Sequence, residues 1–192
     1  MIDGVKLIEL NPIKDDRGWL MEIFRVSITG LQVKQVYLSV VKEGIVKDKD
    51  KFHCHKMKWD MLCCIKGTIK VVLIDSRKGS NTKDKMMEII TGEENPKLII
   101  IPPGILHAFK GLKGDGYVID CETEEFNKEN PDEIKTDNTH YNWDQWPHFS
   151  QCKYVDNKNA YFVSDDTGER VFISLKIETK AMLMNYRLYA AT

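Results

Sequence analysis

The sequence lacks a strong net charge and a long hydrophobic run. Its 192 residues carry 28 Lys and Arg against 29 Asp and Glu, a formal net charge of −1 at pH 7. A chain without a basic field has no general attraction to nucleic acid or to an acidic membrane surface. No segment reaches the roughly 18 consecutive apolar residues that a membrane-spanning helix requires. These absences predict a soluble protein that binds neither nucleic acid nor membranes.

Paired cysteines and a secretory leader are also missing. The five cysteines are odd in number, none are spaced as CxxC, and Cys63 and Cys64 lie within an apolar run. Such cysteines are typical of free, buried thiols in a reducing compartment. The opening residues MIDGVKLIEL contain no basic segment followed by an apolar stretch, as a signal peptide would. These features predict a cytoplasmic protein.

Short segments of branched and aromatic residues, separated by Gly, Asn, Asp or Pro, dominate the chain up to about residue 122. No long stretch in this part has the periodicity of a helix. Short strands with turns at regular spacing favour an all-β fold, an antiparallel jelly-roll barrel. The expected strands are WLMEIF (19–24), KQVYLSVV (34–41), MLCCI (61–65), TIKVVLID (68–75), KMMEIIT (85–91), KLIIIP (97–102) and GYVIDC (116–121).

The remainder of the chain differs in character. Residues 124–149 are polar, and we expect a loop that packs its aromatic residues Tyr141, Trp143 and Trp146 back on the barrel. The expected boundary therefore separates a barrel domain, residues 1–149, from a small appendage, residues 150–192.

The appendage has the signals of a hairpin followed by a helix. Two apolar runs flank the sequence Asp165–Asp166–Thr167–Gly168, which is typical of a β-hairpin. Thr179 can cap a terminal helix with apolar residues at Met182, Leu183, Tyr186 and Tyr189.

The candidate functional residues begin with the sequence FHCHK at residues 52–56. Alternate side chains of a strand share a face, so His53 and His55 point to one side and Phe52 and Cys54 to the other. The second pair has the character of a packed face. In a small barrel, the histidines then face either solvent or the ligand mouth.

A third histidine, His107, follows a strand and a turn in IIIPPGILHAF. A strand, a turn and a second strand can bring His107 beside His53 and His55. The order of HxH, a Gly after a strand, and then PxGxxH is more specific than either motif alone.

That order resembles the metal-binding cupin pattern, with Asp60 where the pattern has Glu. The resemblance extends to the dTDP-4-dehydrorhamnose 3,5-epimerase family. DDRGWLMEIF, VVLIDSRKGSNT, IPPGILHAFKGL and HYNWDQWP are similar to four motifs of that family, in family order, from about residue 13 to 147. The resemblance implies a cupin jelly roll, a nucleotide-linked sugar as the binding partner, no cofactor, and a homodimer.

In that family a histidine removes a proton beside the 4-keto group, a tyrosine on the opposite face returns one, and a lysine stabilises the enolate. The resemblance places the base at His53 and puts His55 where the family has Gln. Asp60 stands where the family has the lysine, and Tyr117 lies one or two positions before the family tyrosine. A slip of one residue changes the face of a strand. We therefore expect altered chemistry on a retained site.

The resemblance also implies substrate-binding residues. Arg17 would contact the diphosphate, because a guanidinium fork suits phosphate oxygens, and Glu22 would line the same site. Asp60, His107 and Tyr117 complete the expected set, with His53 and His55 as the catalytic residues. Asp75 and Arg77 are expected to form a salt bridge in a turn, and Lys56 and Lys58 to be solvated.

Three functions remain open from the sequence. The first is isomerisation or epimerisation of a nucleotide-linked 4-keto-6-deoxy sugar; HxHK also resembles sugar-nucleotide 3,4-ketoisomerases, which move the proton on a single face. The second is a metal-dependent cupin, because His53, His55, His107 and Asp60 suit a divalent metal. The third is a non-catalytic cupin that binds a sugar nucleotide.

Overall fold

The computed structural model describes residues 1–47, 51–137, 141–143, 149–154, 159–164 and 170–174. The chain divides into two compact units, residues 1–145 and 146–192. The first unit carries the three histidines of interest.

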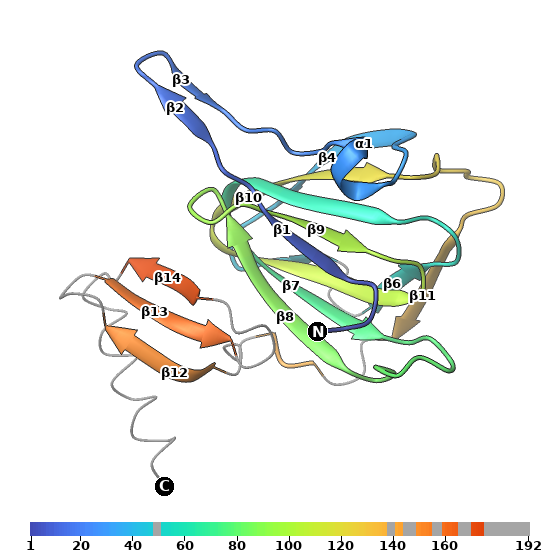
Figure 1. Cartoon of the computed structure of the whole chain (residues 1–192). Helices are drawn as coiled ribbons and strands as arrows, with labels where there is room; N and C mark the ends of the chain where they lie inside the picture. Colours follow the sequence, from blue (N-terminus) through green and yellow to red (C-terminus); the bar gives the residue numbers. More distant parts are fainter. Residues whose placement is uncertain (48–50, 138–140, 144–148, 155–158, 165–169, 175–192) are drawn as a thin grey trace, which may run out of the picture. The chain divides into compact units, whose positions relative to one another are not determined.

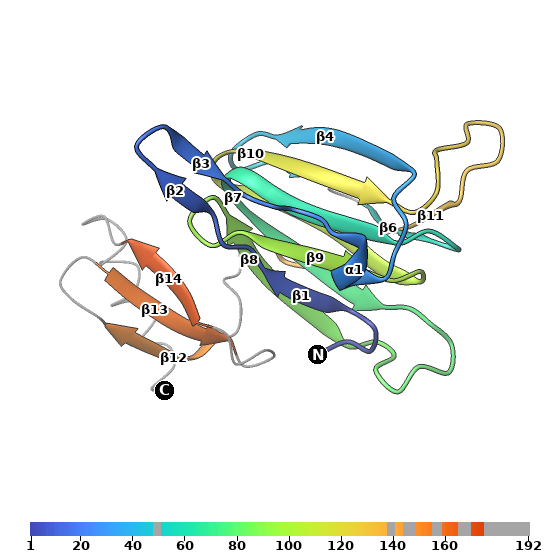
Figure 2. The ribbon, with the colours of Figure 1, turned by 45° about the horizontal axis from the view of Figure 1, so that its top comes forward.

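The first unit is built around one curled antiparallel sheet of nine strands (Figures 1 and 2). Its main path runs β1-β9-β7-β10-β6-β11, while β4 and β5 pair with β10 and β8 pairs with β7. The predicted all-β antiparallel architecture is confirmed. The strands are β1 (Lys6–Glu9), β4 (Gln35–Val41), β5 (Val46–Lys47), β6 (Lys51–His55), β7 (Asp60–Asp75), β8 (Met86–Gly92), β9 (Lys97–Ile101), β10 (Ile105–Glu122) and β11 (Glu133–Asp137).

The two longest strands, β7 and β10, pair along most of their length and form the spine of the sheet. We predicted two strands over residues 61–75, and this is wrong, because β7 runs unbroken through Gly67. Gly67 has φ +72°, and a Cβ there would lie 2.4 Å from the Asp115 carbonyl oxygen. The register of β7 against β10 shifts near this point. Glycine therefore bends the strand at a bulge instead of ending it.

Apolar side chains fill both faces of the sheet. The largest cluster of buried residues includes Leu73, Ile99, Ile105 and Val118. A second cluster contains Met61, Cys63 and Leu98, among others. Cys54, Cys63, Cys64 and Cys121 are free and buried, as the sequence predicted for these four.

A third cluster confirms that Tyr141 and Trp143 pack back on the sheet. The Phe52 and Trp143 rings stack 5.9 Å apart, and Tyr141 meets both rings edge to face. The interpretation of residues 124–149 as a loop is wrong in one respect, because β11 forms within it and pairs with β6. Trp146 lies outside the described residues.

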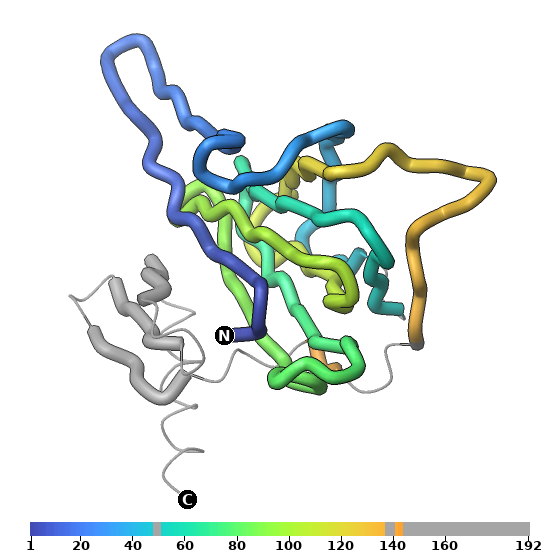
Figure 3. Tube along the Cα trace, turned by 45° about the vertical axis from the view of Figure 1, so that its right-hand side comes forward, coloured from blue at the N-terminus to red at the C-terminus, as the bar shows by residue number. Residues whose placement is uncertain are grey.

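The N-terminal part departs from the predicted strand at 19–24. A short hairpin of β2 (Ile13–Asp15) and β3 (Gly18–Leu20) extends from the body of the first unit, as Figure 3 shows. The strand ends at Leu20, and Met21, Ile23 and Phe24 pack as irregular chain against the second cluster. One turn of helix, α1 (Val26–Thr29), follows.

The second unit contains a three-stranded antiparallel sheet of β12 (Phe149–Tyr154), β13 (Asn159–Ser164) and β14 (Arg170–Ser174). The antiparallel pairing of β13 with β14 confirms the expected hairpin. The strand β12 was not predicted. The expected helix after Thr179 lies outside the described residues.

Asp75 and Arg77 form the predicted turn salt bridge, within a larger network. Asp75 accepts hydrogen bonds from Arg77, Ser80 and Thr82 at 2.6–3.0 Å. Arg77 also donates to the Asp3 carbonyl oxygen at 2.6 Å. The motif DxRxxSxT therefore ties the end of β7 to the N-terminus of the chain.

Within the described part of the chain, no helix is both long and apolar enough to cross a membrane.

Candidate active site

The HxH motif lies on β6, and the alternation predicted for it is confirmed. Phe52 and Cys54 are buried in the core, at 2% and 4% exposure. His53 and His55 point to the other face, with ring centroids 5.4 Å apart, and both line a cavity.

His107 completes the cluster from the neighbouring strand. In the β6–β10 ladder its Cα pairs with that of His53, and the two rings lie 4.2 Å apart. His107 is 5.9 Å from the His55 ring. The strand pairing thus brings the three imidazoles together, as the motif order predicted.

Asp60, the first residue of β7, lies behind the histidines. Its Oδ2 is 3.4 Å from Nε2 of His55 and 3.4 Å from Nε2 of His107. The Nδ1 of His107 lies 3.0 Å from the Ile105 carbonyl oxygen. A carbonyl can only accept, so Nδ1 carries a proton. In a neutral His107, Nε2 is then a bare acceptor that faces the Asp60 carboxyl group.

Burial sets the charge of this cluster. Burial, followed by the His107 and His55 rings, lowers the pKa of His53 to about 2. Burial, followed by Lys58, lowers the pKa of His55 to about 3. Burial also raises the pKa of Asp60 to about 8. At pH 7 the imidazoles of His53 and His55 are therefore neutral, and Asp60 holds a proton that can be shared with a histidine.

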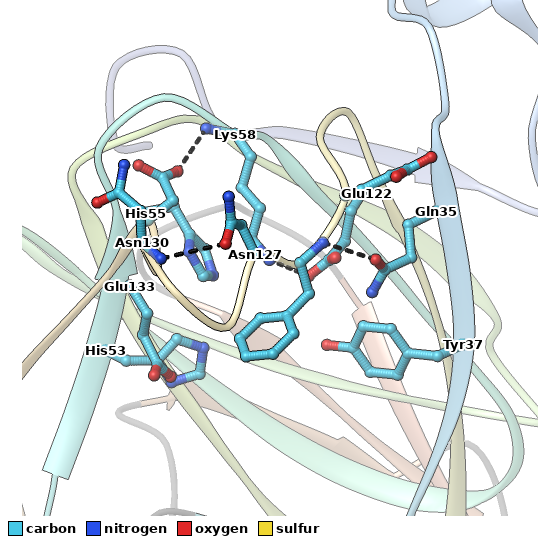
Figure 4. A pocket seen from close by; sticks show the side chains of 12 residues that line it. Gln35, Tyr37, His53, His55, Lys58, Glu122, Asn127, Asn130 and Glu133 are labelled. Atoms are coloured by element: carbon cyan, nitrogen blue, oxygen red, sulfur yellow. Dashed lines mark hydrogen bonds and ion pairs between the residues drawn. The ribbon is translucent and has the colours of Figure 1, made fainter.

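The cavity in front of the histidines has a volume of about 250 Å³. Figure 4 shows His53 and His55 on one side of it and Tyr37 on the other. Eleven of the twelve residues that line it have polar or charged side chains. The lining residues are Gln35, Tyr37, His53, His55, Lys58, Glu122, Glu125, Phe126, Asn127, Asn130, Asp132 and Glu133.

Lys58 is the first cavity-lining residue that the sequence analysis missed. It was expected to be solvated, but it is only 6% exposed, and its ammonium group pairs with Glu122. The Asp132 carboxylate accepts hydrogen bonds from the backbone amides of Lys56, Met57 and Lys58 at 3.0–3.2 Å. This clamp turns the chain after β6 so that the lysine points into the cavity wall.

Tyr37 and Asp120 are the second omission. Tyr37 lies on β4 opposite Asp120 of β10, and its hydroxyl donates to the Asp120 carboxyl group at 2.7 Å. Burial raises the pKa of Asp120 to about 7, and the neighbouring Asp60 adds to the shift. Burial and then Asp120 raise the pKa of Tyr37. Asp120 and Glu122 are two residues apart on one strand, and this spacing was an available signal of a shared face that the sequence analysis did not use.

The comparison with known families decides the assignment. The family model described as dTDP-4-dehydrorhamnose 3,5-epimerase matches residues 1–166. The chain belongs to the dTDP-4-dehydrorhamnose 3,5-epimerase family. The match extends beyond residue 147, where the motif resemblance ended, and it confirms the predicted family.

Two known proteins are similar to the chain over more than half of its length. The spore coat polysaccharide biosynthesis protein SpsL of Bacillus subtilis is 35% identical over 135 residues, which cover 69% of this chain and 87% of SpsL. A dTDP-4-dehydrorhamnose 3,5-epimerase of Methanothermobacter thermautotrophicus is 30% identical over 119 residues, or 59% of this chain and 64% of that protein.

Solved structures of the epimerase family share the fold. The dTDP-4-dehydrorhamnose 3,5-epimerase of Sulfolobus tokodaii superposes with a TM-score of 0.66 and 28% identity, over 74% of this chain and 82% of that one. The relatives' names support the prediction that the chain is an enzyme of the epimerase and isomerase class.

Three residues expected from the epimerase motifs lie apart from the cavity wall. Arg17 is at the turn of the β2–β3 hairpin, with 85% of its side chain exposed and an ion pair to Asp15 at 2.6 Å. Glu22 pairs with Arg25, and the Tyr117 ring lies under the Lys66 ammonium group, 5.2 Å away. Of the described residues, the twelve that line the cavity include none of these three. Their role in substrate binding stays a prediction.

Proposed function

We propose that the protein epimerises or isomerises a nucleotide-linked 4-keto-6-deoxy sugar in deoxysugar biosynthesis. In this proposal His53 removes a proton beside the ketone and His55 assists it. The observation that carries the proposal is a pair of neutral imidazoles at the wall of a polar cavity, backed by a buried carboxylic acid.

The electrostatics of the free protein meet the first requirement of a base at His53, which is an unprotonated imidazole. A general base must be unprotonated before it acts, and the lowered pKa of His53 keeps its imidazole neutral at pH 7. A nucleotide sugar brings the negative charge of its diphosphate, which stabilises a nearby imidazolium. Substrate binding would therefore raise the proton affinity of His53 as the reaction requires it.

Asp60 and His107 support the pair from behind. Asp60 lies 3.4 Å from both His55 and His107. A proton shared among these groups can orient His55 and compensate a charge that forms on the cluster. Asp60 thus acts as a positioning residue here and not as the enolate-stabilising cation that the family lysine provides.

Lys58 offers the cation that the family lysine would supply. Loss of a proton beside a ketone places negative charge on the ketone oxygen, and a fixed cation in a buried site stabilises such an oxyanion. Lys58 lines the cavity and is neutralised by Glu122 in the free protein. Its position in the chain differs from that of the family lysine by two residues.

The substrate class rests on the relatives. Relatives are named for dTDP-4-dehydrorhamnose, and the Legionella pneumophila relative was solved with dTDP-4-keto-L-rhamnose. We propose a dTDP-linked sugar as the partner and no cofactor for the reaction.

Proton exchange tests the proposal directly. The protein is incubated with dTDP-4-keto-6-deoxyglucose in D₂O, and deuterium at the carbons beside the ketone is followed by NMR. We expect exchange by the wild type and its loss in His53→Gln. Binding of dTDP without any exchange would favour the non-catalytic module instead.

One observation favours the metal-dependent alternative. The possible ligand atoms of His53, His55 and His107 lie within 4.8 Å of one another, and the Nδ1 contact of His107 directs its Nε2 inward. These three residues with Asp60 fit a divalent metal, which would polarise the ketone as a Lewis acid. Metal content separates the candidates: about one equivalent in the wild type, lost in His107→Gln, would establish the metal site.

We also propose that the protein works as a homodimer in the cytoplasm. Ile13, Trp19 and Leu20 of the β2–β3 hairpin are 73%, 59% and 64% exposed, and clustered apolar exposure is typical of an interface. Light scattering should show a dimer that Trp19→Glu converts to a monomer. An unchanged mass for Trp19→Glu would exclude the hairpin from the interface.

A further inference from the structure

The wall of the cavity carries more acidic than basic side chains. Of the residues that line it, four are acidic, namely Glu122, Glu125, Asp132 and Glu133, and one is basic, Lys58. With neutral histidines, four carboxylates and one ammonium group give this wall a formal charge of −3. The proposed substrate is a nucleotide sugar, so the sign of this charge bears on which part of the substrate enters.

A wall of this charge opposes an anion. Like charges repel strongly where water is scarce and the effective dielectric constant is low. The ammonium group of Lys58 offers the diphosphate little attraction in the free protein, because Glu122 already pairs with it. The sugar, and not the diphosphate, is therefore the part of the substrate that suits this cavity.

Internal contacts occupy two of the four acidic groups. The Asp132 carboxylate accepts hydrogen bonds from the backbone amides of residues 56–58. Glu133 forms an ion pair with Lys135 at 3.4 Å. Both carboxylates therefore have donors within the chain and require none from a ligand.

Two acidic groups of the wall are left with vacant acceptor oxygens. Glu122 is 2% exposed, and its Oε2 has no hydrogen-bond partner among the described residues. Figure 4 shows this side chain in the wall beside Lys58. Glu125 lines the same cavity and has neither a hydrogen bond nor an ion pair within the described part of the chain. A buried acceptor without a donor costs free energy, so these oxygens favour a ligand that brings donors.

We propose that the sugar taken by this cavity bears a protonated amino group, which Glu122 and Glu125 bind. This inference rests on the proposed function and deepens it, because it narrows the 4-keto-6-deoxy sugar to an amino sugar. A sugar hydroxyl offers one donor and no charge, whereas an ammonium group offers three donors and a positive charge. Only the ammonium group both fills the vacant oxygens and offsets the charge of the wall.

Glu124 provides a matched control for the removal of a carboxylate. It precedes Glu125 directly, pairs with Lys34 at 2.6 Å, and is not among the described residues that line the cavity. Glu125→Gln and Glu124→Gln therefore remove the same charge at adjacent positions, and only the first changes the wall. Glu125 is exposed, so its substitution should leave the fold intact.

The experiment compares the binding of stable sugar nucleotides by calorimetry, on protein freed of metal with EDTA. The probes are dTDP-6-deoxyglucose, its 2-amino and 3-amino analogues, and the N-acetyl form of each analogue. We expect one amino sugar to bind at least about tenfold more tightly than dTDP-6-deoxyglucose, as a hydrogen bond between charged groups typically provides. N-acetylation should abolish this preference. Glu125→Gln should reduce it to less than about threefold, and Glu124→Gln should retain it.

Two results would contradict the inference. Equal binding of the amino sugars and dTDP-6-deoxyglucose by the wild type would overturn it and leave the proposed function intact, because proton exchange beside a ketone does not require an amine. A preference that persists in full in Glu125→Gln would place the amino group away from this wall.

Failure of the proposed function would look different. The wild type would then show no deuterium exchange into any 4-keto sugar, with or without an amino group, while its preference for the amino sugar persisted. That result would overturn the proton transfer and leave a protein that only binds amino sugars.

Discussion

Two buried aspartates of the same sheet, Asp75 and Asp60, have opposite environments. They lie at the two ends of β7 and are 0% and 2% exposed. Asp75 accepts five hydrogen bonds from the backbone and side chain of Arg77, from Ser80 and from Thr82, and these lower its pKa against the opposing effect of burial. Asp60 has two imidazoles at 3.4 Å, and its Oδ1 has no partner among the residues that the structure describes.

The difference separates a structural site from a chemical one. Asp75 lies in a motif that resembles the epimerase family, and Asp60 stands where that family has lysine, but both aspartates are buried, so burial does not distinguish them. A carboxylate whose oxygens accept several hydrogen bonds, as those of Asp75 do, stays charged and fixes the position of the chain. A buried carboxyl group with few hydrogen-bond donors around it keeps its proton. When the pKa of that carboxyl group lies near neutrality, the proton can be transferred to or from a neighbouring group.

The largest effect on activity is expected at His53, in the region around Asp60, where the carboxyl group has few hydrogen-bond donors. His53→Gln should lower the rate of deuterium exchange by about 10³-fold, in the range reported for loss of a general base. The fold should persist, because His53 is only half-buried. Exchange rates and a thermal unfolding curve, measured together, check this. Exchange at the wild-type rate would remove His53 from the chemistry.

Lys58 is expected to show the next largest effect. Lys58→Met should lower exchange by about a hundredfold, the loss typical of one oxyanion-stabilising group. The variant also leaves Glu122 without its cation and should be destabilised. Lys58→Met with Glu122→Gln removes both charges, so it should recover stability without recovering activity. Recovery of both would show that Lys58 has a structural role alone.

The aspartates themselves give the direct test of the comparison. Asp75→Asn places an amide against Arg77 and should lower the free energy of unfolding by about 3 kcal/mol, the cost of breaking charge-assisted hydrogen bonds. Asp60→Asn replaces a neutral acid with a neutral amide and should cost less than about 1 kcal/mol. Urea denaturation measures both values. Equal losses would show that Asp60 is as structural as Asp75.

The pH dependence of stability separates the two regions further. The pKa values of His53 and His55 in the folded, metal-free protein are about 2 and 3, so the unfolded chain binds more protons below about pH 6.5. The free energy of unfolding should fall as the pH drops from 6.5 toward 3, by at most about 1.4 kcal/mol per pH unit and per histidine. His53→Gln should reduce this slope.

The two aspartates, Asp75 and Asp60, change charge over other pH ranges than the histidines. Because the pKa of Asp75 is lowered from its ordinary value of 3.8, the ionised carboxylate stabilises the folded protein at every pH above that value. This stabilisation is lost only as the pH falls below about 3.8. The raised pKa of Asp60, about 8, has the opposite sign: its contribution is complete at low pH and is lost as the pH rises from 3.8 to 8. Asp60→Asn removes this titration. Between pH 5 and pH 8, the change in the free energy of unfolding of Asp60→Asn, measured by denaturation, should therefore equal the part of the wild-type change that the histidines contribute.

Much of the site was accessible from local sequence. The HxH spacing on a strand defined the face of His53 and His55, and the PxGxxH motif located His107. The omissions share a cause. Lys58 points inward because Asp132, 74 residues away along the chain, binds its backbone amide. Tyr37 gains its partner because β4 pairs with β10, 83 residues later. Such contacts leave no periodic pattern in the neighbouring residues.

The sequence by itself determined the antiparallel β fold, the free buried thiols, the epimerase-family motifs and the face on which the two histidines of β6 lie. These properties depend on the period-2 alternation of strands and on short motifs, which are local. Only the tertiary structure decided that the Asp75 carboxylate accepts several hydrogen bonds while Asp60 has an oxygen without a partner among the described residues. It also decided that Lys58 and Tyr37 line the same cavity as His53 and His55. Those properties depend on which strands pair and in what register, and strand pairing is set by contacts between residues distant in the chain.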